Sequence, residues 1–186
     1  QTTIYIAGRQ KYVSSEVEVE GDWSNAAFLL AMGAEVRGLD TSSLQGDSVC
    51  TEYFRALDKG PAELDISNCP DLGPVLMAYA ALRHGAVLTG TGRLRYKESD
   101  RGEAMKEELS KFGIDTVVEE DSIAVGSGAH APACELSGHN DHRVIMALSV
   151  MCANLGGVIE GAEAVNKSYP DFFDKLRNLG IEISEA

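Results

Sequence analysis

The chain has 186 residues, of which 44% are hydrophobic, and an excess of acidic side chains gives it a net charge of −13. Such an acidic balance argues against nucleic acid and anionic membranes as partners, and no apolar run reaches the ~18 residues that a membrane span needs. We expect a cytoplasmic protein, because no secretory signal is visible at the start and the cysteines, which form no CxxC pair, indicate reduced thiols.

Residues 1–20 differ from the rest of the chain. Residues 3–6 and 16–20 alternate between apolar and polar side chains, as half-buried strands do. We predict that these are strands from the end of a neighbouring domain or from a crossover, and that residues 21–186 form one domain.

Residues 21–186 contain a unit that occurs three times. Each unit begins with an Asp and an apolar run, reaches a glycine and a short β-type stretch, and then meets a second Asp that opens a second helical segment. The first Asp and its apolar run lie at residues 22–28, 71–77 and 141–147, the β-type stretches at 35–38, 86–90 and 158–161, and the second Asp at Asp47, Asp100 and Asp171.

Each unit is predicted to contain two kinds of helix, both opened by an Asp that binds the free N–H groups of the first turn. The first helix is apolar nearly all round, which is typical of a helix buried on every side. The second is one-sided: Met105, Leu109 and Phe112 recur at helical spacing, with Glu107 and Lys111 paired on the wet face. Further strands are predicted at residues 62–66, 114–118 and 122–125, the last two as a hairpin.

These patterns predict the fold class. We expect an α/β (α+β) domain with an inside-out, barrel-like architecture. In it, three buried inner helices are wrapped by sheets and by three outer helices.

Cationic side chains gather where the predicted helices begin. Arg101 and Arg143 lie in first turns, and Lys167 leads into the last helix. A cation at a helix N-terminus opposes the helix dipole, so we infer that these three residues face an anion, which Arg can bind in a bidentate way. Solvated surface charges, or local ion pairs with Asp100 and Asp141, are the alternative interpretation.

Six motifs in this order resemble those of the 5-enolpyruvylshikimate-3-phosphate synthase family, and the likeness runs over almost the whole chain. They are VEGD at 19–22, LQGD at 44–47, CPD at 69–71, KESDR at 97–101, NDHR at 140–143 followed by Met146, and KSYPDF at 167–172. The resemblance implies a two-domain fold, each domain built from three repeated units with buried inner helices. It also implies a transferase of the shikimate pathway of aromatic amino acid biosynthesis. Such an enzyme moves the enolpyruvyl group of phosphoenolpyruvate to the 5-hydroxyl of shikimate-3-phosphate and releases phosphate, without a metal or other cofactor.

The resemblance further implies roles for individual residues. Asp71 is similar to the general base at the acceptor hydroxyl, Glu98 to the acid that handles the methylene proton of the donor, and His142 to a histidine beside the reaction centre. From the residues alone, Asp71 could be a helix N-cap, either instead of the base or in addition to it. Glu98 could be an exposed glutamate at a helix start, and His142 a capped or core histidine. The implied substrate-binding residues are Lys97, which touches both substrates, Arg101 and Arg143, which clamp the donor carboxylate, and Lys167, which lies near the donor phosphate.

Part of the family's pattern is missing. An early Lys-Ser segment, a Ser-Ser-Gln segment and an upstream Arg, which hold shikimate-3-phosphate from the other domain, have no counterpart here. Arg93 stands where the family usually has a polar residue that contacts the acceptor hydroxyls, and the segment between Asp47 and Asp71 is short by one strand pair. With Gln1 in first place, this indicates a fragment that lacks its N-terminal domain and is inactive alone.

Three other interpretations remain open. A UDP-N-acetylglucosamine enolpyruvyl transferase would share the fold and the donor, although the 97–101 and 140–143 motifs fit it poorly. A non-catalytic anion-binding domain would use the same cations. A zinc site from Cys134, His139 and His142 would lack a fourth ligand of usual geometry.

Overall fold

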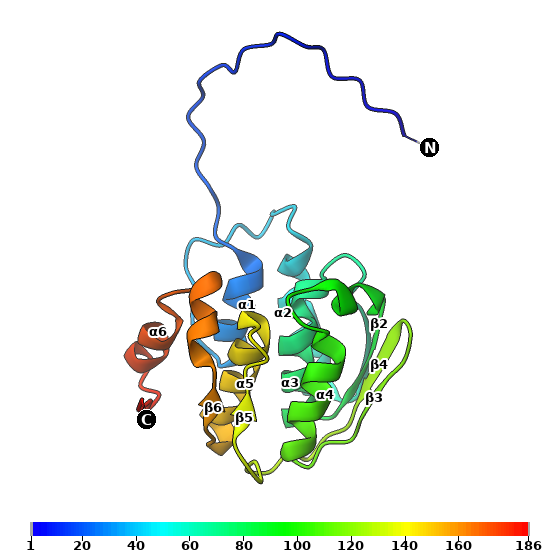
Figure 1. The fold of residues 1–186 in the computed structure, drawn as a ribbon, viewed down its shortest axis with the longest axis vertical. Coiled ribbons are helices and arrows are strands. Elements are labelled where there is room, and N and C mark those ends of the chain that lie inside the picture. Colours follow the sequence, from blue (N-terminus) through cyan, green and yellow to red (C-terminus); the bar gives the residue numbers. More distant parts are fainter. Residues whose placement is uncertain (1, 186) are drawn as a thin grey trace.

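The N-terminal segment stands apart from the folded part of the chain. The computed structural model describes residues 2–185. In it, residues 2–20 form neither helix nor strand and extend away from the other elements (Figure 1). The strands predicted at residues 3–6 and 16–20 are therefore not formed. A strand pairs its backbone N–H and C=O groups with a neighbouring strand, and Figure 1 shows no second strand beside this segment.

Three inner helices form the centre of the fold. They are α1 (Trp23–Ala31), α3 (Gly73–Leu82) and α5 (His142–Leu155), of which α3 and α5 pack against each other. Every residue of α3 from Gly73 to Ala81 is buried, because its side chains are apolar on all sides and each side has to be covered. The predicted buried inner helices are confirmed.

Within residues 2–185, two small sheets flank these helices, one beside α3 and α4 (Arg101–Lys111) and the other beside α5 (Figure 1). The larger has the strand order β1-β2-β4-β3, with β1 parallel to β2 and the other neighbours antiparallel. The β3–β4 hairpin was predicted, whereas β5 was not. The strands are β1 (Ala62–Asp65), β2 (Ala86–Thr89), β3 (Thr116–Val118) and β4 (Ser122–Val125) in the larger sheet, and β5 (Leu136–Ser137) parallel to β6 (Ile159–Glu160) in the smaller.

One backbone hydrogen bond recurs where the chain enters each inner helix. The Ile66 N–H donates to Thr89 O at 2.9 Å, and the Gly138 N–H donates to Glu160 O at 2.9 Å; both bonds continue a parallel strand pair. The Gly21 N–H makes the equivalent bond to Gly38 O at 3.0 Å. Nevertheless, the strand predicted at 35–38 is absent. Residues 16–20, which could pair with it on one side, extend away. On the other side, the described residues form no hairpin between α2 (Cys50–Lys59) and α3.

The outer helices are α2 (Cys50–Lys59), α4 (Arg101–Lys111) and α6 (Phe172–Asn178). As predicted, Met105, Leu109 and Phe112 are fully buried. The predicted pair of Glu107 with Lys111 is wrong, because Lys111 Nζ lies 2.9 Å from the buried Glu108 carboxylate instead. A cation gains more from a desolvated partner than from one in water.

Within the described residues, four short 3-10 turns precede helices α2, α3, α4 and α6, and one of them changes a predicted helix start. They are η1 (Gly46–Val49), η2 (Pro70–Leu72), η3 (Gly92–Tyr96) and η4 (Ala162–Lys167). Asp47, predicted to open an outer helix, lies within η1, and α2 begins only at Cys50. Among residues 2–185, every helix is too short or too polar to traverse a bilayer.

Candidate active site

Arg101 is the centre of an ion-pair network at the start of α4. Its guanidinium is almost fully buried and meets three carboxylates. Nε lies 2.9 Å from Asp141 Oδ2, Nη1 lies 2.8 Å from Asp71 Oδ1, and Nη2 lies 2.6 Å from Glu98 Oε2. Three segments that are 30 to 40 residues apart in the sequence therefore meet at one side chain.

Local helix chemistry explains why Asp141 lies there. It is the N-cap of α5, and its Oδ1 accepts the Arg143 N–H at 2.8 Å, as capping aspartates do. Its Oδ2 also accepts from Ser99 Oγ at 3.0 Å. Burial by itself raises the pKa of Asp141, but the hydrogen bond and charge of Arg101, together with the hydrogen bonds from the Arg143 N–H and Ser99, leave the pKa below its ordinary value. Asp141 is thus a fully buried anion that holds Arg101 against the start of α5.

Asp71 faces the same network from the start of α3. It lies in η2 and makes no side-chain cap bond, so the N-cap interpretation of this residue is wrong. Lys97 Nζ lies 2.9 Å from Asp71 Oδ1, the oxygen that Arg101 also contacts. Burial raises the pKa of Asp71. The hydrogen bond from Lys97 and the charges of Arg143, Lys97 and Arg101 lower it by more, so the net pKa is below its ordinary value and the carboxylate is ionised at neutral pH.

Arg143 differs from Arg101 in that its described hydrogen bond goes to a neutral hydroxyl and its paired carboxylate lies beyond hydrogen-bond distance. It is 6% exposed, and its Nη2 donates to Ser24 Oγ at 2.7 Å. Among the described residues, its Nε and Nη1 are buried without any hydrogen-bond partner, and the nearest paired carboxylate oxygen, Asp71 Oδ2, is 3.9 Å away. Because a buried cation with unsatisfied donors is costly, this guanidinium is suited to receive an anion.

Glu98 lies between Arg101 and His142. Its Oε2 contacts Arg101 and its Oε1 lies 3.7 Å from His142 Nδ1, beyond hydrogen-bond distance. His142 Nδ1 is buried without a partner in the described part of the chain. Burial, followed by the charge of Arg143, lowers the pKa of His142, so the imidazole is neutral at pH 7.

Lys167 reaches the same end of the molecule by another route. It ends η4, which packs on α5, and its Nζ lies 2.6 Å from Asn140 O and 2.7 Å from Asn140 Oδ1. It therefore lies at the loop that leads into α5, beside the network and outside its ion pairs. The structure thus brings Lys97, Arg101 and Arg143 around Asp71, with Lys167 at the adjoining helix start.

Sequence reasoning missed three members of this site. Asp141 had appeared only as a possible local partner of a cation, and Ser24 had no role at all. Asp47 also approaches: burial and then the charge of Asp71 raise its pKa, and its Oδ1 is buried without a partner in the described residues. The signal for Ser24 was the Asp-x-Ser sequence at the start of α1, which is typical of a cap.

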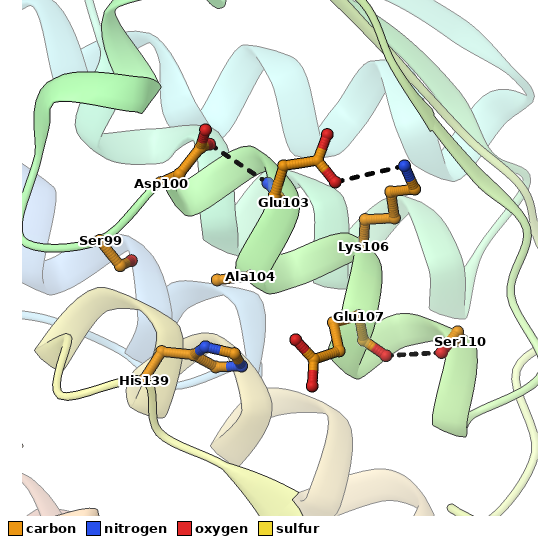
Figure 2. A pocket seen from close by; sticks show the side chains of 8 residues that line it. All are labelled: Ser99, Asp100, Glu103, Ala104, Lys106, Glu107, Ser110 and His139. Atoms are coloured by element: carbon orange, nitrogen blue, oxygen red, sulfur yellow. Dashed lines mark hydrogen bonds and ion pairs between the residues drawn. The ribbon is translucent and has the colours of Figure 1, made fainter.

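A separate shallow pocket of about 430 Å³ lies on the outer side of α4. Figure 2 shows His139 facing Glu107 across it, with Asp100, Glu103 and Lys106 along the helix. In the range 2–185, Glu107, Glu108 and His139 form the one group whose ligand atoms could reach a common metal ion. This group includes neither Cys134 nor His142 of the zinc interpretation. Its Glu108 oxygens already bind Lys111, the Ser137 N–H and His139.

Comparison with known proteins gives one family. A family model described as EPSP synthase (3-phosphoshikimate 1-carboxyvinyltransferase) matches residues 1–176. The 3-phosphoshikimate 1-carboxyvinyltransferase of Clostridium kluyveri is 38% identical over 97% of this chain and 48% of its own length. That of Methanococcus vannielii is 33% identical over 98% of this chain and 49% of its own. The chain therefore spans about half the length of these relatives.

Solved structures show the same fold. EPSP synthase from Acinetobacter baumannii superposes with a TM-score of 0.77 at 23% identity, over 95% of this chain and 50% of that one. The enolpyruvyl transferase NikO from Streptomyces tendae gives a TM-score of 0.62 at 18% identity, over 91% of this chain and 45% of that one. At these identities the likeness supports the fold alone, and it confirms the predicted architecture.

Proposed function

Since this chain belongs to the EPSP synthase family, we propose that it supplies the donor-binding part of an enolpyruvyl transferase. The reaction moves the enolpyruvyl group of phosphoenolpyruvate to the 5-hydroxyl of shikimate-3-phosphate and releases phosphate. The observation that carries this proposal is Arg143, a buried cation with two unsatisfied donors beside Lys97 and the Arg101 network. A donor with a carboxylate and a phosphate supplies the anion that such a site lacks.

The cations divide between the two ends of the donor. Arg143 and Arg101 bind its carboxylate, Lys167 approaches its phosphate, and Lys97 bridges donor and acceptor. The Nε and Nη1 groups of Arg143 can bind the donor carboxylate without displacing a hydrogen-bond partner among the described residues. Arg101 is already matched by three carboxylates, so its approach to the donor displaces one of them, and the half-exposed Glu98 is the one held least firmly by burial.

The acids carry the proton transfers. The 5-hydroxyl oxygen attacks C2 of the donor and loses its proton to Asp71, while Glu98, in its carboxylic acid form once it has left Arg101, gives its proton to C3. Its lowered pKa keeps Asp71 ionised before the hydroxyl arrives, so the carboxylate has a free site for the proton. In the second step Glu98 takes a proton back from the new methyl group, the double bond forms again, and the C2–O bond to phosphate breaks. The departing phosphate carries away the proton that Asp71 accepted. Neutral His142 lies beside Glu98 and can accept or donate one hydrogen bond during these transfers.

The acceptor site is completed by a second domain. In this proposal residues 21–186 are one domain, and residues 1–20 lead into the missing N-terminal domain, which holds the phosphate of shikimate-3-phosphate. The chain alone is then inactive, because positioning both substrates in one cleft contributes up to ~7–11 kcal/mol to such reactions.

Phosphate release by the full-length protein that contains this chain tests the proposal. We expect saturable release that needs both phosphoenolpyruvate and shikimate-3-phosphate, and a fall in kcat/KM of about 10²–10³ for Arg143→Ala, as for loss of one preorganised donor. Release with UDP-N-acetylglucosamine instead would show the related transferase. Anion binding without turnover would show a non-catalytic domain, and either result would contradict the proposal.

A further inference from the structure

The side chain that holds Arg143 lies on a different inner helix. Ser24, in the first turn of α1, accepts the Arg143 Nη2–H at 2.7 Å across a separation of 119 residues in the chain. Ser24 is 7% exposed. The ring of Phe28, one helical turn further along α1, lies 5.8 Å from the centre of the guanidinium. The first two turns of α1 therefore contact the Arg143 guanidinium through one hydrogen bond and one aromatic ring.

The Ser24 hydroxyl has a fixed orientation. It donates to Asp22 Oδ1 at 2.9 Å, and the same oxygen accepts the Ser24 backbone N–H at 3.0 Å. Because the single hydroxyl proton points to Asp22, the lone pairs are left to accept from Arg143. The Asp22 carboxylate thus supports the Arg143 charge through a neutral hydroxyl and does not pair with it directly.

A neutral partner has a consequence for binding. A carboxylate in the place of Ser24 would neutralise Arg143, as Asp141 does for Arg101. Without any partner, Nη2 would be buried and unsatisfied, and the guanidinium would turn toward Asp71, whose Oδ2 is only 3.9 Å away. Either change would pair Arg143 with a carboxylate and so weaken its attraction for an incoming anion.

We propose that Ser24 is a positioning residue that holds the Arg143 guanidinium away from Asp71 and leaves its Nε and Nη1 free for the donor anion. The inference rests on the proposed function, because it assigns Ser24 to the donor end of that same site. Ser24 lies two residues after the Asp of the first unit, and Arg143 lies two residues after the Asp of the third unit.

Steady-state kinetics of the full-length protein that contains this chain, with Ser24→Ala, test the inference. We expect the KM for phosphoenolpyruvate to rise about 10- to 100-fold, while kcat and the KM for shikimate-3-phosphate change less than threefold, because the lost contact orients one donor-binding side chain. Ser24→Thr, which keeps the hydroxyl, should restore most of the donor affinity. If Ser24→Ala does not fold, Ser24→Cys keeps the shape with a much weaker acceptor and should give the same rise.

Ser42 provides a matched control. It follows Asp40 as Ser24 follows Asp22, and its N–H and hydroxyl bind Asp40 Oδ1 at 2.8 and 2.7 Å, but it is exposed and binds no arginine. Ser42→Ala should leave both KM values unchanged. A Ser24→Ala effect on the donor KM no larger than that of Ser42→Ala would overturn the inference.

A double-mutant cycle separates this inference from the proposed function. In an Arg143→Lys background, Ser24→Ala should raise the donor KM by less than twofold. A rise of the full size in that background would also overturn the positioning role. If Arg143→Ala itself leaves the donor KM unchanged, the proposed donor site is wrong; if only Ser24→Ala leaves it unchanged, the positioning role alone is wrong.

Discussion

Asp141 connects helix capping to the ion-pair network within a single side chain. It is fully buried and binds the Arg101 Nε, the Ser99 hydroxyl and the Arg143 N–H. Asp141→Asn keeps the shape but places an amide donor against the guanidinium. Removing one partner of a buried ion pair costs about 3–5 kcal/mol, and we expect the lower end, because two other carboxylates remain on Arg101.

Urea unfolding of the variant measures this cost. Asp174→Asn is the matched control, because Asp174 pairs with Arg177 at 2.8 Å on the surface, with a side chain that is 73% exposed. Exposed ion pairs contribute ~0–1 kcal/mol. Equal losses in the two variants would contradict the buried network.

Asp141 should also contribute to the fall in unfolding free energy at low pH. The pKa of Asp141 is lower in the folded chain than its ordinary value of 3.8, so the unfolded state binds protons first as the pH falls. Its contribution is complete above about pH 5 and is lost as the pH falls from there through the folded pKa. Unfolding free energies measured from pH 6 to pH 2.5 should fall more steeply for the parent than for Asp141→Asn. Parallel curves would show that Asp141 does not carry the effect.

Glu98 is expected to affect catalysis far more than stability. Its side chain is 40% exposed and shares Arg101 with two better-buried carboxylates. In the full-length protein, Glu98→Gln should lower kcat about 10²–10⁴-fold, as expected for a general acid, while the unfolding midpoint changes little. Phosphate release and thermal unfolding of the same preparation check both parts. A stable variant with unchanged kcat would remove Glu98 from the proton transfers.

The sequence predicted which charges would meet at the site, but not which of them would be neutralised. Arg101 and Arg143 both lie at helix starts, and the pattern treats them alike. In the structure three carboxylates match Arg101, whereas Arg143 has a serine. That difference depends on which side chains from other units lie beside each arginine. The spacing of residues within one unit cannot predict these long-range contacts.

At the scale of elements, the inner helices should dominate stability. Leu76 lies in α3, fully buried on the helix that packs against α5. Leu76→Ala should lower the unfolding free energy by about 2–5 kcal/mol, because it removes buried methyl groups and leaves a cavity. Leu179, which is 50% exposed just after α6, is the control, and Leu179→Ala should cost less than about 1 kcal/mol. Similar losses for both would contradict the buried-helix architecture.

Element prediction succeeded where periodicity and burial agree. The apolar runs of α3 and α5 and the alternation of the β3–β4 hairpin predict those elements from local sequence. β5 consists of two residues and exists only because Leu136 and Ser137 pair with β6, so no local pattern could reveal it. The stretch 35–38 has a strand-like sequence but no paired neighbours, because strand formation depends on partners outside the segment.

At the scale of the whole molecule, the first unit has the start of a strand pair that the other two units complete. The Gly21–Gly38 hydrogen bond occupies the same place as those that follow β1 and β5. Residues 16–20 continue directly from it, and the exposed Val17 and Val19 side chains alternate as a half-buried strand requires. When the proposed second domain holds the N-terminal segment in place, we expect residues 16–20 to lie parallel to residues 35–38.

Hydrogen exchange on the full-length protein checks this third pair. Amides in 35–38 should exchange at least tenfold more slowly than in the 186-residue chain, because ladder bonds protect them. Gly21→Ala should abolish the protection, since a Cβ at this position would lie 2.8 Å from Gly38 O. Gly8→Ala is the control, because a Cβ there meets no atom within 4 Å. Protection that survives Gly21→Ala, or rapid exchange in the parent protein, would show that the first unit does not use the entry geometry of the other two.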